Sequence, residues 1–143
     1  YLTKEEILSS VSVDENFDRD NHLYLYAIVR TDLEMPVGKL SAQVGHAYTD
    51  SLKNAEETHP KAYQNYFDSN LGGSKVLLKA KNDDKLVAAY NKAIELGLPC
   101  SIIVDRHHVM PPHFDGSPII TALGIGPCLR SEAKEITKKF QCL

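Results

Sequence analysis

Short apolar runs alternate along the chain with segments whose apolar residues recur at helical spacing. The first run, residues 23–30, is Leu-Tyr-Leu-Tyr-Ala-Ile-Val-Arg, which is typical of a strand buried on both faces of a sheet. The same kind of pattern predicts further strands at 74–80, 100–104 and 119–125, and helices at 38–52, from 60 to about 69, from 83 to 96 and at 131–140. This order of strands and helices indicates a layered α/β domain.

The connection before the last strand differs from the others. Residues 106–118 contain Pro111, Pro112 and Pro118 and cannot hold a crossover helix. Because a parallel strand needs such a crossover, we expect the last strand to run antiparallel to its predecessor. Its start would then lie close to Asp105, at the end of the preceding strand.

The first 22 residues read as an extension of this domain. Thr3 and Glu6 have the spacing of a capping box, which predicts a short helix. Residues 13–21 are acidic and without pattern, as in a linker. We therefore expect an N-terminal helix and linker over 1–22 and one compact domain over 23–143.

The composition favours a soluble cytoplasmic protein. No apolar run approaches the roughly 20 residues that span a membrane, and no signal-peptide pattern opens the chain. Cys100, Cys128 and Cys142 are odd in number and lack the close spacings of a metal site. Reduced thiols of a cytosolic protein are the simplest interpretation, with neither metal nor membrane expected.

The net charge of −3 argues mildly against a nucleic acid as the ligand, because phosphate binding is usually accompanied by a surplus of basic residues. A local basic patch can still exist within an acidic chain. Six lysines lie in the middle of the sequence, at positions 53, 61, 75, 79, 81 and 85. They form either such a patch or an ordinary solvated face.

The predicted helix from residue 38 carries a polar stripe. At 100° per residue, Lys39, Gln43 and His46 fall on one face, while Leu40 and Val44 belong to the apolar face. Lys39 occupies the first turn, where acidic residues are usual. An anionic ligand that met both this ammonium group and the free N–H groups of the helix end would compensate the unfavourable charge. A surface lysine and a packing histidine are the plainer interpretations.

Polar residues also follow two predicted strands. Asp105 ends one of them and Arg30 ends the first, and α/β domains commonly bind ligands at the carboxyl ends of parallel strands. Thr121 lies near the start of the last predicted strand, 119–125, and the run Leu-Gly-Ile-Gly-Pro follows at 123–127. Glycines there let the backbone come close to a ligand or to another segment of the chain.

These pieces together resemble the type II peptidyl-tRNA hydrolases. The matching stretches are, in order, Ile-Val-Arg-Thr-Asp-Leu at 28–33, Gly38-Lys39, Ala42-Gln43, His46-Ala47, Lys75 to Leu78, Leu-Gly-Leu-Pro at 96–99, Asp105, Thr121 and Leu-Gly-Ile-Gly-Pro at 123–127. The resemblance implies an α/β/α sandwich around a four-stranded mixed sheet and hydrolysis of peptidyl-tRNA without metal or cofactor. It implies that Lys39, Asp105 and Thr121 are the active-site residues, and it makes a homodimer an expectation.

The loop after Asp105 departs from the family pattern. It reads Arg-His-His-Val-Met, so that Val109 stands where the family has a threonine, and it is longer than usual. Here His107, His108 or His113 could supply polar groups to the substrate, and protonation below about pH 6.5 would favour phosphate. We expect this loop to tune substrate choice, unless it is only a packed surface loop.

The resulting hypothesis is attack of water on an ester carbonyl. Asp105 would orient or deprotonate the water, the ammonium of Lys39 would stabilise the oxyanion or a tRNA phosphate, and Thr121 would position water or substrate. Gln43, His46, Arg30, His107 and His108 would bind the substrate. Two alternatives remain, namely a non-catalytic tRNA- or protein-binding module and a metal-dependent hydrolase that uses the loop histidines.

Overall fold

The computed structural model describes residues 1–11, 17–68, 73–106, 109–112 and 114–143. Its elements, in chain order, are α1 (Lys4–Ser9), β1 (Leu23–Arg30), α2 (Val37–Thr58), α3 (Pro60–Asp68), β2 (Ser74–Ala80), α4 (Asp83–Glu95), β3 (Cys100–Asp105), β4 (Val109–Met110), β5 (Phe114–Asp115), β6 (Ile119–Leu129), α5 (Arg130–Thr137) and β7 (Gln141–Cys142). The predicted α/β alternation is confirmed, although α2 and β6 extend further than their patterns indicated.

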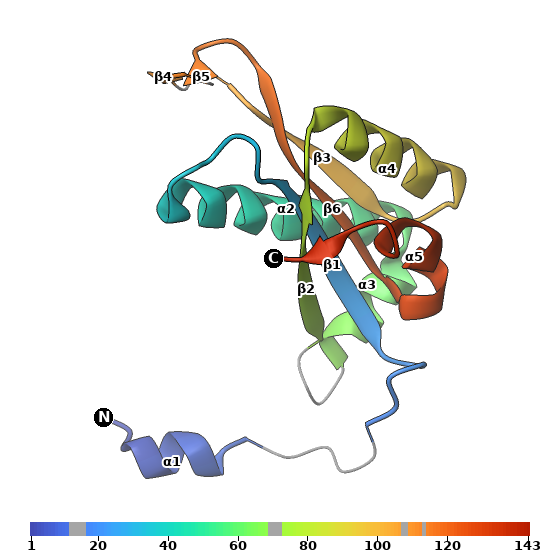
Figure 1. Cartoon of the computed structure of the whole chain (residues 1–143). Coiled ribbons are helices and arrows are strands. Elements are labelled where there is room, and N and C mark those ends of the chain that lie inside the picture. The colour runs from blue at the N-terminus through green and yellow to red at the C-terminus, as the bar shows by residue number, and fades with distance from the viewer. Residues whose placement is uncertain (12–16, 69–72, 107–108, 113) are drawn as a thin grey trace.

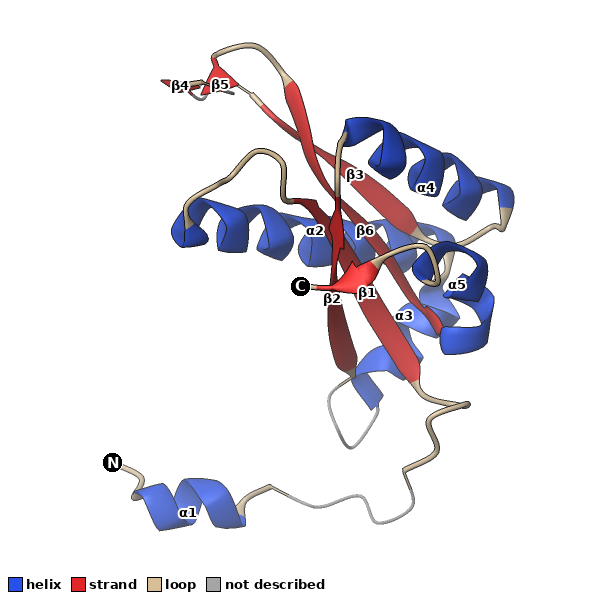
Figure 2. Ribbon diagram, in the orientation of Figure 1, coloured by secondary structure: helices blue, strands red, loops and turns tan. Residues whose placement is uncertain are grey.

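One mixed sheet has the strand order β3-β6-β1-β2-β7 (Figure 2). β1 runs parallel to β2 and antiparallel to β6, and β6 runs antiparallel to β3. The three strands β1, β2 and β3 therefore point the same way, and their carboxyl ends lie at one edge of the sheet. The prediction that β6 reverses direction after the proline-rich connection is confirmed.

The prediction of four strands is wrong, because five strands pair in this sheet within the described part of the chain. β7 adds a short antiparallel strand, with Leu78 opposite Cys142 and Lys79 opposite Gln141. Two residues are too few to leave an alternating pattern in the sequence, and their pairing follows from the way α5 returns the chain to the edge of β2. Within the connection predicted as a loop, β4 and β5 form a separate two-stranded hairpin.

Helices cover both faces of the sheet (Figure 1). Along β1, Tyr26 and Ile28 pack in the core beneath α4 and α5, whereas Ala27 and Val29 pack in the core beneath α2. Alternate residues of a strand point to opposite faces, so an uninterrupted apolar strand requires two helical layers. The continuous apolar run of β1 is explained by this double burial.

The glycines of β6 allow close approach of other segments of the chain. A Cβ atom at Gly124 would overlap the carbonyl of Ala47 on α2, and one at Gly126, where φ is +107°, would overlap the carbonyl of Tyr24. Ser51 of α2 also donates a hydrogen bond of 2.6 Å to the carbonyl of Gly126. The glycines of residues 123–127 were expected to allow close approach either of a ligand or of another segment of the chain. The structure shows close approach of other segments of the chain.

The N-terminal helix lies apart from the sheet (Figure 1). It begins after Thr3, whose hydroxyl accepts a hydrogen bond of 3.1 Å from the backbone N–H of Glu6, and none of its residues is buried. The predicted cap and short helix are therefore confirmed. In the described part of the chain, no helix combines the length and apolar character that crossing a membrane requires.

Candidate active site

Lys39 and Asp105 form an ion pair at the carboxyl edge of the sheet. α2 begins at Val37, which puts Lys39 in its first turn, and Asp105 is the last residue of β3. The Nζ of Lys39 lies 2.7 Å from Oδ2 of Asp105, and their side chains are only 11% and 16% exposed. The electrostatic attraction within a short, largely buried ion pair is stronger than within the same pair in water. The fold thus joins two sequence-predicted residues from segments 66 positions apart.

A surface hollow of about 310 Å³ adjoins this pair, and we call it the Asp105 hollow. Its lining consists of Gln43, His46 and Asp50 from α2, with residues 102–106 at the end of β3. Gln43 and His46 follow Lys39 on one helical face, as predicted. Asp50 was not singled out, although it continues the same stripe one turn further on. Extending the helical periodicity to residue 50 would have found it.

Thr121 lies behind the hollow rather than in it. The residue is fully buried at 0% exposure, and its hydroxyl donates a hydrogen bond of 2.6 Å to Oε1 of Gln43. Because that bond occupies the amide oxygen, the NH2 group of Gln43 is left as the end that can donate elsewhere. The hydroxyl therefore contacts a residue of the hollow, not solvent.

Arg30 is held inside the protein. It is 8% exposed, and it donates to both carboxylate oxygens of Asp32, at 3.0 and 2.7 Å. Its Nη1 also donates a bond of 2.9 Å to the carbonyl of Ile120, next to Thr121. These contacts fix the end of β1 to the start of β6. A substrate contact by Arg30 stays a prediction.

His107, His108 and His113 lie outside the described residues, so their predicted roles stay predictions. Within the described ranges, no three His, Cys, Asp or Glu side chains gather as a metal site would need.

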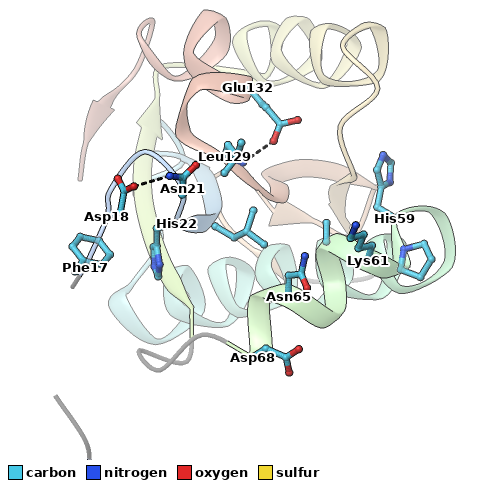
Figure 3. A pocket seen from close by; sticks show the side chains of 13 residues that line it. Phe17, Asp18, Asn21, His22, His59, Lys61, Asn65, Asp68, Leu129 and Glu132 are labelled. Atoms are coloured by element: carbon cyan, nitrogen blue, oxygen red, sulfur yellow. Dashed lines mark hydrogen bonds between the residues drawn. The ribbon is translucent and has the colours of Figure 1, made fainter. Parts of the chain in front are cut away.

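A larger hollow of about 850 Å³ lies at the opposite edge of the sheet (Figure 3). His22 and Leu23 at the start of β1 line it, together with Leu129 at the end of β6 and Asn65 of α3. His22 is 8% exposed, and its Nε2 lies 2.7 Å from the hydroxyl of Ser74. None of the described residues predicted to act in catalysis or binding lines this hollow. The chemistry suggested by the sequence therefore concentrates at the other edge.

The fold and the site define a class of protein. It is an α/β domain with a mixed sheet and a lysine–carboxylate pair at the carboxyl edge of its parallel strands, next to a hydrogen-bonded pair of polar side chains. Comparison with known proteins identifies the family within this class. The family described as Peptidyl-tRNA hydrolase PTH2 matches residues 23–143. The chain therefore belongs to the PTH2 family.

Similar proteins come from archaea and from a eukaryote. A peptidyl-tRNA hydrolase of Methanocaldococcus jannaschii is 34% identical over 120 residues, which cover 83% of this chain and 98% of that protein. One from Sulfolobus acidocaldarius is 39% identical over 121 residues, covering 81% and 96%. A probable peptidyl-tRNA hydrolase 2 of Dictyostelium discoideum is 33% identical over 114 residues, covering 80% of this chain and 51% of that protein.

Proposed function

We propose that this protein hydrolyses the ester that links a peptide, or an N-blocked aminoacyl group, to tRNA, and so releases free tRNA. Membership of the PTH2 family and the names of its relatives support the reaction. The observation that carries it is the ion pair between Lys39 and Asp105, at 2.7 Å, beside a solvent-accessible hollow. Its position at the carboxyl edge is the place where α/β sheets bind ligands.

Asp105 is proposed as the group that activates water. Its Oδ2 faces Lys39, and none of the other described residues donates a hydrogen bond to Oδ1. Since Asp105 also lines the hollow, a water held there could give its proton to this carboxylate as its oxygen attacks the ester carbonyl. The bond from the carbonyl carbon to the ribose oxygen then breaks, and the proton taken up by Asp105 passes to that ribose oxygen. The products are a peptide carboxylic acid and a free ribose hydroxyl, and the Asp105 carboxylate is restored.

Two donors are proposed to stabilise the negative charge that develops on the carbonyl oxygen. The ammonium of Lys39 is one, and it is fixed in place by Asp105. The other is the NH2 group of Gln43, whose direction is set by Thr121. Donors that are oriented before the reaction act strongly in a partly desolvated site. Thr121 is then a positioning residue rather than a catalytic one.

Substitution of Asp105 tests this function. Asp105→Asn keeps the size of the side chain but cannot accept the proton, so we expect hydrolysis of N-acetyl-aminoacyl-tRNA to fall by about 100-fold or more. Free aminoacyl-tRNA is the comparison substrate. Asp68→Asn makes the same charge change on α3 and should keep full activity. A folded Asp105→Asn protein with normal activity would remove Asp105 from the mechanism. Tight binding of acyl-tRNA by the native protein without any release would favour the non-catalytic alternative.

A further inference from the structure

Four lysines line a second surface hollow at the carboxyl ends of β1 and β2. The hollow has a volume of about 520 Å³, and we call it the lysine hollow. Its lining consists of Thr31, Lys79, Ala80, Lys81, Lys85, Lys139, Phe140 and Gln141. Half of these residues are cationic, and no carboxylate side chain is among them. This concentration of positive charge occurs in a chain whose net charge is −3.

The fold collects these lysines from three segments. Lys79 and Lys81 flank the end of β2, and Lys85 follows in the first turn of α4. Lys139 comes from the turn between α5 and β7, and the pairing of Gln141 with Lys79 fixes that turn beside β2. Three of the six lysines grouped in the middle of the sequence thus meet a fourth from its end.

The four side chains are exposed, and none of them forms an ion pair with a described carboxylate. Lys92, by contrast, is paired with both Glu95 and Glu135. Nearby Asp83 and Asp84 lie in the first turn of α4, where they complement the positive end of the helix. Gathered cations that form no ion pairs with described carboxylates repel one another, and a polyanionic ligand would replace that repulsion by attraction.

The lysine hollow lies at the same edge of the sheet as the candidate active site. Asp105 ends β3 and Ala80 ends β2, and these strands are three positions apart in the order β3-β6-β1-β2. At about 4.8 Å between neighbouring strands, the two sites are roughly 14 Å apart. Thr31 of the lysine hollow directly follows Arg30, which is bonded to the start of β6. A ligand a few nucleotides long could therefore reach both sites.

We infer that the lysine hollow binds backbone phosphates of the tRNA, at a distance from the ester that is cleaved. This inference rests on the proposed function. Lysine ammonium groups attract phosphate by their charge. They lack the fixed hydrogen-bonding geometry that recognition of a particular base requires. Phosphate rather than base recognition is also favoured by the lining, in which Phe140 is the one aromatic residue and is half-buried. Such a contact would bind tRNA whatever its sequence.

The test neutralises the four lysines together, as Lys79→Gln, Lys81→Gln, Lys85→Gln and Lys139→Gln in one protein. A matched control removes four exposed lysines elsewhere: Lys4→Gln, Lys53→Gln, Lys61→Gln and Lys134→Gln. Affinity for uncharged tRNA is measured by fluorescence anisotropy at several salt concentrations. Steady-state kinetics are measured on N-acetyl-aminoacyl-tRNA and on an N-acetyl-aminoacyl ester of adenosine, which has no phosphate.

We expect the hollow variant to bind tRNA about 10-fold more weakly, with the slope of log affinity against log salt reduced by about 2 to 3. KM for the tRNA substrate should rise while kcat stays, and cleavage of the adenosine ester should not change. The Tm of the hollow variant at low salt should stay the same or rise, because repulsion among the lysines has been removed.

Unchanged tRNA affinity and salt slope in the hollow variant, or an equal loss in the control, would overturn the inference. If native protein cleaves neither ester while the hollow variant still loses tRNA affinity, the proposed hydrolysis fails and the lysine hollow stands.

Discussion

The hydroxyl of Thr121 shows how a buried group can set the direction of a polar side chain at the surface. It donates to Oε1 of Gln43, and Gln43 lines the Asp105 hollow. Without that bond, the amide of Gln43 could rotate and turn its oxygen toward the hollow, where it would repel a developing oxyanion. In this structure Thr121 contacts the hollow through Gln43, so the role that the family resemblance implies for Thr121 would act through this neighbour.

Substitution at residue 121 separates positioning from packing. Thr121→Val keeps the shape and removes the donor, so we expect kcat on N-acetyl-aminoacyl-tRNA to fall roughly 10-fold or more with KM nearly unchanged. Thr121→Ser retains the hydroxyl and should restore most of kcat. If the valine and serine variants lose kcat to the same extent, the effect is one of packing rather than of hydrogen bonding.

At the scale of elements, the contact between α2 and β6 positions the site. Lys39 and Gln43 lie on the same helix as Ala47, whose carbonyl approaches the backbone of Gly124 on β6. Any shift of α2 away from the sheet would also move Lys39 relative to Asp105. α2 and β6 can pack this closely because glycine, at position 124, has no side chain.

Adding one methyl group at this contact should destabilise the protein. We expect Gly124→Ala to lower the free energy of unfolding by about 1–3 kcal/mol, because the new Cβ would overlap backbone atoms that cannot move independently. Gly45→Ala is the matched control within α2. A Cβ there meets nothing within 4 Å, and alanine is favoured over glycine in a helix by up to about 1 kcal/mol.

Urea unfolding of the two variants and the native protein gives the comparison. If Gly124→Ala is as stable as Gly45→Ala, the close approach of α2 to β6 does not limit the packing. Loss of activity together with stability in Gly124→Ala would further link the helix contact to the position of Lys39.

At the scale of the whole molecule, both cores contain or adjoin groups that resist ionisation. Burial, and then the neighbouring Cys128, raise the pKa of Tyr26 to about 12. Burial, and then Tyr66, raise the pKa of Tyr48 to about 12, and burial raises that of the Cys128 thiol to about 12. The Cys128 thiol therefore stays protonated at neutral pH.

These raised pKa values predict instability in alkali. The folded protein holds these protons more tightly than the unfolded chain, whose tyrosines and cysteines have ordinary values of 10.0 and 9.0. Their contribution to stability is therefore complete below about pH 9 and is lost as the pH rises toward 12. We expect Tm to fall steadily as the pH rises from about 9 to 11. Tyr48→Phe should show a shallower fall, since one titrating group is gone, whereas Tyr1→Phe should follow the native protein. Parallel pH dependence in Tyr48→Phe and the native protein would contradict this assignment.

Several features of the molecule were determined by the sequence alone. Apolar runs and helical stripes predicted β1, β2 and α4, Thr3 predicted the start of α1, and the prolines of 106–118 predicted the direction of β6. These features depend on neighbouring residues, so a short stretch of chain contains the whole signal. The polar stripe of α2 likewise placed Lys39 and Gln43 on one face.

Only the tertiary structure decided the remaining features. The fifth strand, the bond between Thr121 and Gln43 and the contact of Gly124 with α2 each join segments far apart in the chain. The sequence grouped six lysines by position, but packing brought together three of them and added Lys139 from the last turn. The periodicity of the sequence indicates which face of a helix or strand a residue occupies. The neighbours of that residue across the fold depend on packing, and for the lysine hollow they depend on how α5 and β7 return to the sheet. For that reason the elements and the polar face could be predicted, and the contacts that complete the site and the lysine hollow could not.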